Sequence, residues 1–404
     1  MRMVGTTARG LRAPIIHEGQ NLVKIVVNCV VESAKSEGYE IKDRDIIAVT
    51  ESILARAQGN YASIDDIAED IKQKFESDTI GVVFPIMSRN RFQQNLKAIA
   101  RSMKKVVIQI EYPADEVGNQ LVPIDEIEDS GINPWSDVYT EAEFREIFPV
   151  IKHLYTGYDY IKLYRDTVEA EGAECEIILS NRAETILDYT QHVLVSNIHD
   201  RKRTFNRIKK AGAKQVLSLQ DILNNPITED GGYNDEFGLL GANYASDERV
   251  KLFPRHSQEF VIELQKALQE VTGKHIEAMV YGDGAYKDPF GGIWEMADPV
   301  VSPGYTEGLG GTPNEVKIKM IADKDFEDLS GEELTNEITG LLKTRNEKRD
   351  SSEEDDSNED HSLGTTPRRI PDLLGSFADL TSGSGDKGTP FVYIQGYFDN
   401  YADQ

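Results

Sequence analysis

A carboxylate between two glycines follows a short apolar run in the second half of the chain. Residues 278–281 are apolar and predict a buried strand, which ends where Gly282 and Gly284 flank Asp283. The glycines allow a tight turn and let the backbone approach a ligand closely. Lys287 follows in the same loop. Acids and a lysine on flexible backbone after a strand suit a metal–phosphate site, because hard cations bind carboxylate oxygens and add water and phosphate ligands.

A second carboxylate lies in a similar setting about 35 residues earlier. Residues 237–240 predict a small apolar strand, followed by Asn243 and Asp247, and a predicted helix over 257–272 leads on to the Asp283 stretch. Two strand ends joined through one helix can face one cleft. We therefore expect Asp247 and Asp283 to share one or two divalent ions. Glu295 is a third candidate ligand; a solvated loop acid is its alternative interpretation.

Two arginines open a predicted helix directly after a predicted strand. Ser88 can cap the helix over 89–103, and Arg89 and Arg91 lie in its first turn. A helix N-terminus attracts anions, so these side chains could bind a phosphate or a substrate carboxylate. An ordinary serine cap with two solvent-facing arginines is the alternative. Lys287 likewise could contact a metal-bridged phosphate, or form a surface salt bridge.

The composition limits the class of protein. The chain has 404 residues, with 70 acidic against 44 basic side chains and a formal net charge of -26, which argues against a nucleic-acid binder. Two cysteines predict neither a disulfide framework nor a zinc site. No apolar run approaches the length of a membrane span, and the N-terminus lacks a signal-peptide core. We expect a soluble cytoplasmic protein that does not bind a membrane.

Predicted strands and helices alternate in the first third of the chain, which indicates an α/β fold with α+β elements. A mixed sheet forms the core, with an inserted middle region, an acidic linker and a C-terminal tail. Further expectations are a strand over 314–321, a helix over 331–343 and an edge strand over 391–394. The predicted divisions are the core halves 1–111 and 175–345, an inserted subdomain 112–174, a disordered linker 346–366 and a tail 367–404.

Four stretches in this order resemble the coenzyme F420-0:L-glutamate ligase (gamma-glutamyl ligase) family. They are residues 10–22, residues 43–59 with Glu51 and Arg56 where lysines are usual, residues 238–247, and residues 282–289 with Lys287 where an arginine is usual. The resemblance covers about residues 5–110 and 235–345 and marks a divergent member.

The resemblance implies an amide-forming ligase that uses GTP as co-substrate and Mg²⁺ or Mn²⁺. An acceptor carboxylate, not identified by the sequence, is phosphorylated to an acyl phosphate, which the amino group of L-glutamate attacks. Asp247 and Asp283 match the metal-bearing elements of the family. Together with the expectations from the residues, the candidate metal ligands are Asp247, Asp283 and Glu295, the candidates on the nucleotide side are Arg89, Arg91 and Asn243, and the candidate catalytic residue is Lys287. A homodimer is compatible with this interpretation.

Two other functions remain open from the residues. A metal-dependent phosphatase or hydrolase could use the same carboxylates to activate water. A non-catalytic nucleotide- or metabolite-binding protein could retain the fold, because a fold does not determine a function.

Overall fold

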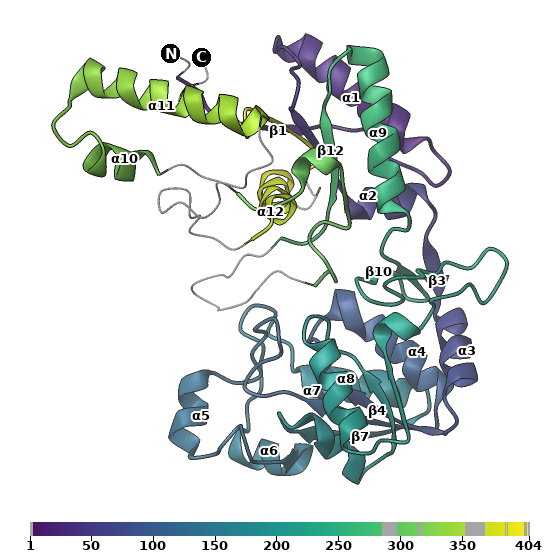
Figure 1. Ribbon diagram of the computed structural model, residues 1–404. Coiled ribbons are helices and arrows are strands. Elements are labelled where there is room, and N and C mark those ends of the chain that lie inside the picture. The colour runs from purple at the N-terminus through teal and green to yellow at the C-terminus, as the bar shows by residue number, and fades with distance from the viewer. Residues whose placement is uncertain are drawn as a thin grey trace.

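The computed structural model describes residues 3–284, 297–313, 317–351, 368–383, 385, 387–399 and 402, without side chains at 345–351. Figure 1 shows two lobes, with a small three-stranded sheet between them. We call the lobe that holds the five-stranded sheet the first lobe. The lobe that holds the six-stranded sheet is the second lobe.

The first-lobe sheet combines both ends of the chain. Its strand order is β1 (Thr7–Leu11), β14 (Phe391–Gln395), β2 (Ile46–Thr50), β12 (Glu277–Tyr281) and β13 (Gly304–Tyr305). Only β2 and β12 are parallel to each other. Every side chain of these two strands is buried, and alternate residues join the clusters on opposite faces of the sheet.

Helices cover both faces of this sheet, which explains the continuous apolar character of its central strands. Helices α1 (Leu22–Glu37) and α9 (Ser257–Thr272) pack on one face, and α12 (Ile370–Ser382) packs on the other. The helix predicted over 257–272 is confirmed, and Gly273 ends it in the left-handed conformation.

The C-terminal strand is not an edge strand, and that expectation is wrong. β14 lies between β1 and β2, and its residues Phe391, Val392, Tyr393 and Ile394 are buried. The sequence did not predict the strand Thr7–Leu11, which covers the other side of β14.

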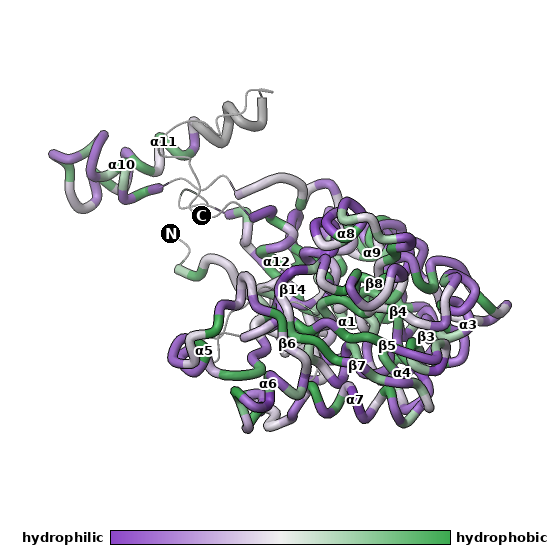
Figure 2. The backbone as a smooth tube through the Cα atoms, turned by 90° about the horizontal axis from the view of Figure 1, so that it is seen from below, coloured by the Kyte–Doolittle hydropathy of each residue, from purple (hydrophilic) through white to green (hydrophobic). Residues whose placement is uncertain are grey.

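The second lobe is a doubly wound sheet. Its order is β6 (Tyr139–Thr140), β7 (Glu174–Leu179), β5 (Lys105–Ile110), β4 (Thr79–Val83), β8 (His192–Val195) and β9 (Gln215–Ser218), and all but β6 are parallel. Its apolar strands β5 and β7 appear green in Figure 2. Its helices are α3 (Ile64–Lys74), α4 (Gln94–Ser102), α5 (Ile124–Ser130), α6 (Glu141–Ile147), α7 (Tyr160–Ala170) and α8 (Arg201–Lys210).

Sheet membership does not follow the divisions expected from the sequence. Strands from 79–110 and 174–218 share the second-lobe sheet, so the predicted core halves each contribute to both lobes. The alternation of strand and helix confirms the α/β class. The five predicted ranges stay a prediction as domain boundaries.

The three-stranded sheet has the order β10 (Asn243–Ser246), β11 (Arg249–Lys251) and β3 (Tyr61–Ser63). The strand expected over 237–240 is wrong, because these residues form turns and β10 begins at Asn243. Helix α2 (Glu51–Ala57) is short. A wider π-helical turn lies at Arg89–Gln93, and tighter 3₁₀ turns lie at Ala183–Asp188, Leu219–Asp221 and Glu307–Leu309.

Helices α10 (Ile318–Lys324) and α11 (Gly331–Ser351) extend away from the first lobe (Figure 1). The strand predicted over 314–321 is therefore wrong at residues 318–321, where Ile321 packs against Ile338 and Leu342 of α11. Helix α11 continues to Ser351, so it includes the first residues of the predicted linker, and residues 352–366 of that linker lie outside the described residues. No helix among the described residues is long and apolar enough to span a membrane.

Candidate active site

The carboxyl ends of β2 and β12 meet at one edge of the first-lobe sheet. The strands are parallel, and Tyr281 pairs with Thr50 at their ends. Glu51 and the loop that carries Asp283 therefore leave the sheet side by side. Ligands of open α/β sheets bind outside the carboxyl ends of the strands, so this edge is the first candidate for a site.

Arg91 of the second lobe reaches this edge and contacts two aspartates. Its Nη2 lies 2.8 Å from Asp283 Oδ2, and its Nη1 lies 2.9 Å from Asp298 Oδ1. Nη1 also donates to the carbonyl oxygen of Gly241 at 3.2 Å. Asp298 is fully buried, while 21% of the Asp283 side chain is exposed. We call Arg91, Asp283 and Asp298 the arginine–aspartate cluster.

The electrostatics of the cluster follow from burial and close charges. Burial and the Asp283 carboxylate raise the pKa of Asp298 well above its ordinary value, although Arg91 acts in the opposite direction. Burial disfavours the charged form of Arg91, but Asp298 and Asp283 outweigh it and raise the pKa of the guanidinium. The negative charge of Glu51 acts on both groups, so Glu51 belongs to the same electrostatic environment.

Two backbone N–H groups in the loop after β12 donate hydrogen bonds to carboxylates. The Asp283 amide donates to Asp298 Oδ2 at 2.8 Å, and the Gly284 amide donates to Asp379 Oδ2 of α12 at 3.1 Å. A Cβ on Gly282 would lie 2.5 Å from Asp298 Oδ2. Glycine at position 282 is therefore what allows the Asp298 carboxylate to approach the backbone.

A buried ion pair lies beside the cluster. Lys251 Nζ of β11 is 2.8 Å and 2.9 Å from the two carboxylate oxygens of Glu51, and both side chains are less than a tenth exposed. The charge of Lys251 also acts on Asp298. The pair thus connects the three-stranded sheet to the end of β2.

The register of the three-stranded sheet places five polar side chains on one face. Lys251 is opposite both Asn243 and Tyr61, and Arg249 is opposite Ser63. Directly opposite residues share a face, and residues two apart on a strand share it too. Asn243, predicted on the nucleotide side, therefore lies on the same face as Lys251.

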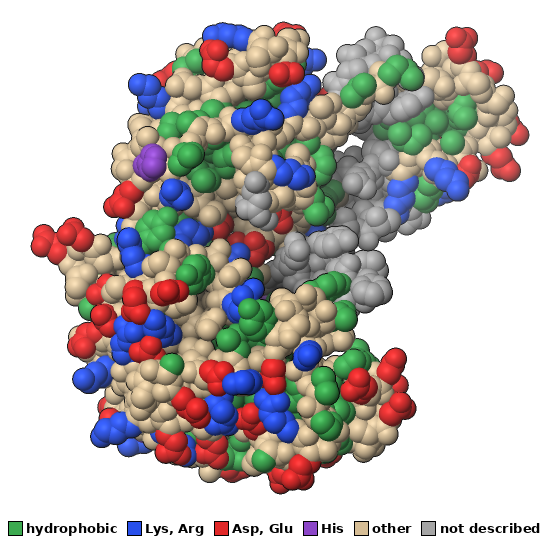
Figure 3. Space-filling model, turned by 180° about the vertical axis from the view of Figure 1, so that it is seen from behind, with side chains coloured by type: hydrophobic (Ala, Val, Ile, Leu, Met, Phe, Trp, Pro, Cys, Tyr) green, Lys and Arg blue, Asp and Glu red, His purple; other side chains and the backbone are tan. Residues whose placement is uncertain are grey.

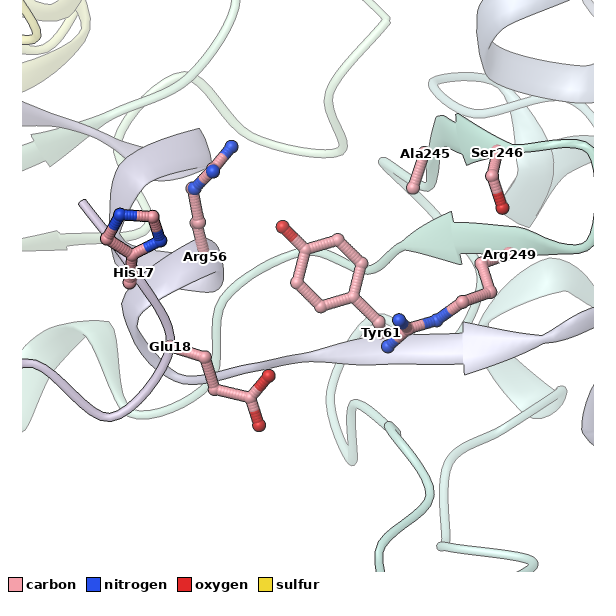
Figure 4. Close-up of a pocket in the computed structure, with 7 residues that line it drawn as sticks. All are labelled: His17, Glu18, Arg56, Tyr61, Ala245, Ser246 and Arg249. Atoms are coloured by element: carbon pink, nitrogen blue, oxygen red, sulfur yellow. The ribbon is translucent and has the colours of Figure 1, made fainter. Parts of the chain in front are cut away.

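A pocket of about 300 Å³ opens beside this face (Figure 4). Arg56, His17 and Glu18 line one side, and the phenol of Tyr61 points towards the Arg56 side. The other side is lined by Arg249, Ala245 and Ser246. Two guanidinium groups and one carboxylate make this pocket suited to a charged ligand.

The other predicted site residues have different partners. Arg89 Nη1 donates to the Tyr158 hydroxyl at 3.0 Å, and its guanidinium stacks over that ring. Asp247 follows β10, where its Oδ1 accepts from the Tyr244 hydroxyl at 2.9 Å. No hydrogen bond or ion pair among the described residues joins Asp247 to Asp283 or to its partners Arg91 and Asp298, so their sharing of a metal stays a prediction. Lys287 and Glu295 lie outside the described residues.

Sequence reasoning correctly places Asp283 beside a strand end and Arg91 in the first turn after a strand, but it does not predict that they contact each other. It assigns no role in the site to Asp298, Glu51 or Lys251. Glu51 directly follows an apolar strand, which is a usable signal. Within the described ranges, no three His, Cys, Asp or Glu residues are grouped so that they could hold a metal ion.

Comparison with known families adds one finding. The sequence model described as F420-0:Gamma-glutamyl ligase matches residues 10–396, which is nearly the whole chain. The match includes the middle region that the resemblance in the sequence left uncovered. No curated protein matches the chain.

Proposed function

The chain belongs to the F420-0:gamma-glutamyl ligase family, and from this membership we propose how its residues perform the ligation. It is an amide-forming ligase. The proposed reaction transfers the γ-phosphoryl group of GTP to an acceptor carboxylate, which gives an acyl phosphate and GDP. The amino nitrogen of L-glutamate then bonds to the carbonyl carbon, the C–O bond to phosphate breaks, and the nitrogen loses a proton.

The observation that supports this proposal is the arginine–aspartate cluster at the carboxyl ends of β2 and β12. Phosphoryl transfer depends on positioned charges rather than on covalent help from the protein. The cluster supplies one fixed cation and two carboxylates where ligands of such sheets bind.

Asp283 and Asp298 fit a magnesium or manganese ion because these hard cations bind carboxylate oxygens. Mg²⁺ is commonly held by one or two carboxylates together with substrate phosphates, so a group of three protein ligands is not required. We propose Asp283, with Asp298 behind it, as the protein ligands, and Asp247 as a further candidate. When bound, the ion would neutralise charge on the transferring phosphoryl group.

The remaining residues of the site have positioning roles in this proposal. Gly282 lets Asp298 hold the Asp283 amide, so the loop cannot move without breaking that bond. Arg91 fixes the spacing of the two carboxylates and keeps their charge compensated before substrates arrive. Lys251 adds a second cation on the side of Glu51.

Incubation of the full-length protein with GTP, Mn²⁺, L-glutamate and a metabolite extract tests the proposal. We expect GDP and phosphate to form only when glutamate and an acceptor are present, together with a product heavier by one glutamyl residue in mass spectrometry. Glutamate-independent phosphate release would instead indicate a phosphatase. Nucleotide-dependent thermal stabilisation without turnover would indicate a non-catalytic binder.

Variants separate the candidate metal ligands. Asp283→Asn should reduce kcat by roughly 10²-fold or more, the range for losing one preorganised electrostatic contact. Asp247→Asn reports on the ligand predicted from the sequence, and Asp129→Asn on the exposed face of α5 is the control. A homodimer and a cytoplasmic location are further parts of the proposal; light scattering of the purified protein checks the first.

A further inference from the structure

Asp115 is a buried carboxylate in the loop that follows β5 of the second lobe. Acidic side chains are common on the surface of this lobe (Figure 3), but Asp115 is only 8% exposed. A carboxylate is costly to bury unless hydrogen bonds compensate its charge. The partners of Asp115 therefore indicate what its burial stabilises.

The Asp115 carboxylate accepts hydrogen bonds on both of its oxygens. Oδ1 accepts from the Val117 and Asn119 amides at 3.1 and 2.9 Å, which closes a turn within the same loop. Oδ2 accepts from the Asn119 side chain at 2.8 Å and from the Met87 amide at 2.7 Å. The Met87 contact joins this loop to the segment after β4, so Asp115 fixes the backbone just before Arg91.

Tyr164 of α7 fixes the same segment through its hydroxyl. The hydroxyl donates to the Ile86 carbonyl oxygen at 2.5 Å and accepts from the Ser88 amide at 3.1 Å. Ser88 Oγ in turn accepts from the Arg91 amide at 3.2 Å. The backbone over 86–88 is therefore anchored to Asp115 and to Tyr164, and the helical turn that carries Arg91 begins where this backbone ends.

The loop that carries Asp115 is itself held at two further points. Glu116 accepts from three consecutive backbone amides, those of residues 198–200, before α8. Asn119 Oδ1 lies 3.1 Å from His153 Nε2. A shift of Asp115 would disturb these contacts as well. The loop thus provides a rigid reference for the segment after β4.

We propose that Asp115 and Tyr164 position Arg91 for the ligation by holding the backbone after β4. This inference rests on the proposed function, because it concerns the same site. The hold keeps the guanidinium 2.8 and 2.9 Å from the two aspartates of the arginine–aspartate cluster. Groups that take part in a reaction must stay within about 0.5 Å of their productive positions, and surrounding hydrogen bonds supply that precision.

Both positioning residues act through the backbone of another residue. Among the described residues, neither Asp115 nor Tyr164 has a hydrogen bond or ion pair with the cluster itself. Both belong to the region 112–174, which the sequence predicts as an inserted subdomain. The proposal therefore gives that region a part in the reaction.

Steady-state kinetics of the full-length protein test the proposal. Asp115→Asn replaces one carboxylate oxygen by an N–H donor, so some of the groups around it lose their acceptor. Tyr164→Phe removes only the hydroxyl. Each should lower kcat roughly 10- to 100-fold, since a displacement of about 1 Å near reacting groups has a cost of this order. The KM for L-glutamate should change by about twofold or less, because the loss falls on the transition state.

Two matched variants control for a general loss of stability. Asp70 is another buried aspartate of the second lobe, and its Oδ2 accepts from the Leu223 amide at 2.7 Å. Asp70→Asn should therefore lower Tm and leave kcat unchanged. Tyr160→Phe removes a hydroxyl from the same helix as Tyr164, at a position without a hydrogen bond to 86–88 in the described structure, and should also leave kcat unchanged.

A thermodynamic cycle tests the positioning without turnover. Arg91→Ala removes the side chain that Asp115 positions, so Asp115→Asn should lower Tm less in the Arg91→Ala background than in the wild type. Asp70→Asn should lower Tm equally in both backgrounds. Tyr164→Phe takes the place of Asp115→Asn in the cycle if the double variant does not fold.

The outcomes separate this inference from the proposed reaction. Wild-type kcat in both Asp115→Asn and Tyr164→Phe overturns it, as does a loss of kcat that Asp70→Asn shares. Equal losses of Tm in the two backgrounds overturn it too. If the wild type carries out no ligation but the cycle shows coupling, the hold on Arg91 is supported and the proposed function fails. Absence of both ligation and coupling overturns both proposals.

Discussion

The Arg91 guanidinium and the Asp283 carboxylate form an ion pair of 2.8 Å between the two lobes. Arg91 lies in the first turn after β4 of the second lobe, and Asp283 lies in the loop after β12 of the first lobe. The sequence assigns one to an anion and the other to a metal, yet each compensates the other. Binding of a cation at Asp283 and of a phosphate at Arg91 would therefore proceed by exchange of this pair.

Removal of the Arg91 side chain should lower the free energy of unfolding far more than removal of the Arg89 side chain. Arg91→Ala leaves Asp298 buried without its charge partner, a change that costs about 3–5 kcal/mol in the free energy of unfolding. Arg89→Ala loses an exposed contact with Tyr158, worth about 1 kcal/mol or less. Urea unfolding measures both, and equal losses would contradict the buried pair. Asp298→Asn in the Arg91→Ala background should restore part of the stability.

Gly282→Ala should reduce activity without a comparable loss of folding. The new Cβ would lie 2.5 Å from Asp298 Oδ2 and displace the carboxylate from the Asp283 amide. A displacement of about 1 Å near reacting groups can cost on the order of 10²-fold in kcat. Gly340→Ala in α11 is the matched control, because nothing lies within 4 Å of its added Cβ. A Gly282→Ala enzyme with wild-type kcat would remove this loop from the reaction.

Glu51 and Lys251 should show strong coupling in a double-mutant cycle. Either Glu51→Gln or Lys251→Met leaves one buried charge unpaired, at a cost of about 3–5 kcal/mol. The double variant should lose much less than the sum of the single losses, because no unpaired charge remains. Thermal unfolding measures the three free energies. Additive losses would show that the two charges do not depend on each other.

Glu111 should make the protein less stable as the pH rises. It follows β5, its Oε2 has no hydrogen-bond partner among the described residues, and burial raises its pKa to about 8 from 4.5. The folded state therefore binds the Glu111 proton more tightly than the unfolded state does. The contribution of this proton to the free energy of unfolding is complete below about pH 4.5 and is lost as the pH rises through about 8. Glu111→Gln should show a smaller fall in Tm between pH 5 and pH 9 than the wild type, whereas Glu126→Gln in α5 should not. An identical fall in all three proteins would contradict the raised pKa.

Lys287 lies outside the described residues, so its catalytic role stays a prediction. If it stabilises the transferring phosphoryl group, Lys287→Ala should lower kcat by roughly 10²-fold with little change in Tm. A surface salt bridge would instead leave kcat within about a factor of two, because such pairs contribute at most about 1 kcal/mol. Kinetics combined with thermal unfolding distinguish these results.

Short-range features of the fold are predictable because their signals are local. Asn21 caps α1, and Gly38 ends it with a φ of 69°, and asparagine and glycine commonly occupy these two positions of a helix. The apolar runs at 45–50, 80–86 and 105–110 form β2, β4 and β5. Each of these elements needs only its own residues to be recognised.

Long-range relationships could not be predicted from the single sequence. Arg91 is 192 residues from Asp283, and Glu51 is 200 residues from Lys251, so periodicity cannot indicate either contact. The interior position of β14 depends on pairing with β1, which is almost 390 residues away in the chain. Charged residues at such contacts look like solvated loop residues until the fold brings them together.

The interior position of β14 determines the order in which the lobes can be completed during synthesis. The second-lobe sheet uses a continuous stretch of chain that ends at β9, so it can fold while later residues are still being made. The first-lobe sheet has a gap between β1 and β2 until residues 391–395 leave the ribosome. A chain that is cut or stalled before Phe391 would therefore hold a complete second-lobe sheet, while β2 in the first lobe would lack its neighbour β14 and the Ile46–Val49 backbone would lack its pairing on that side.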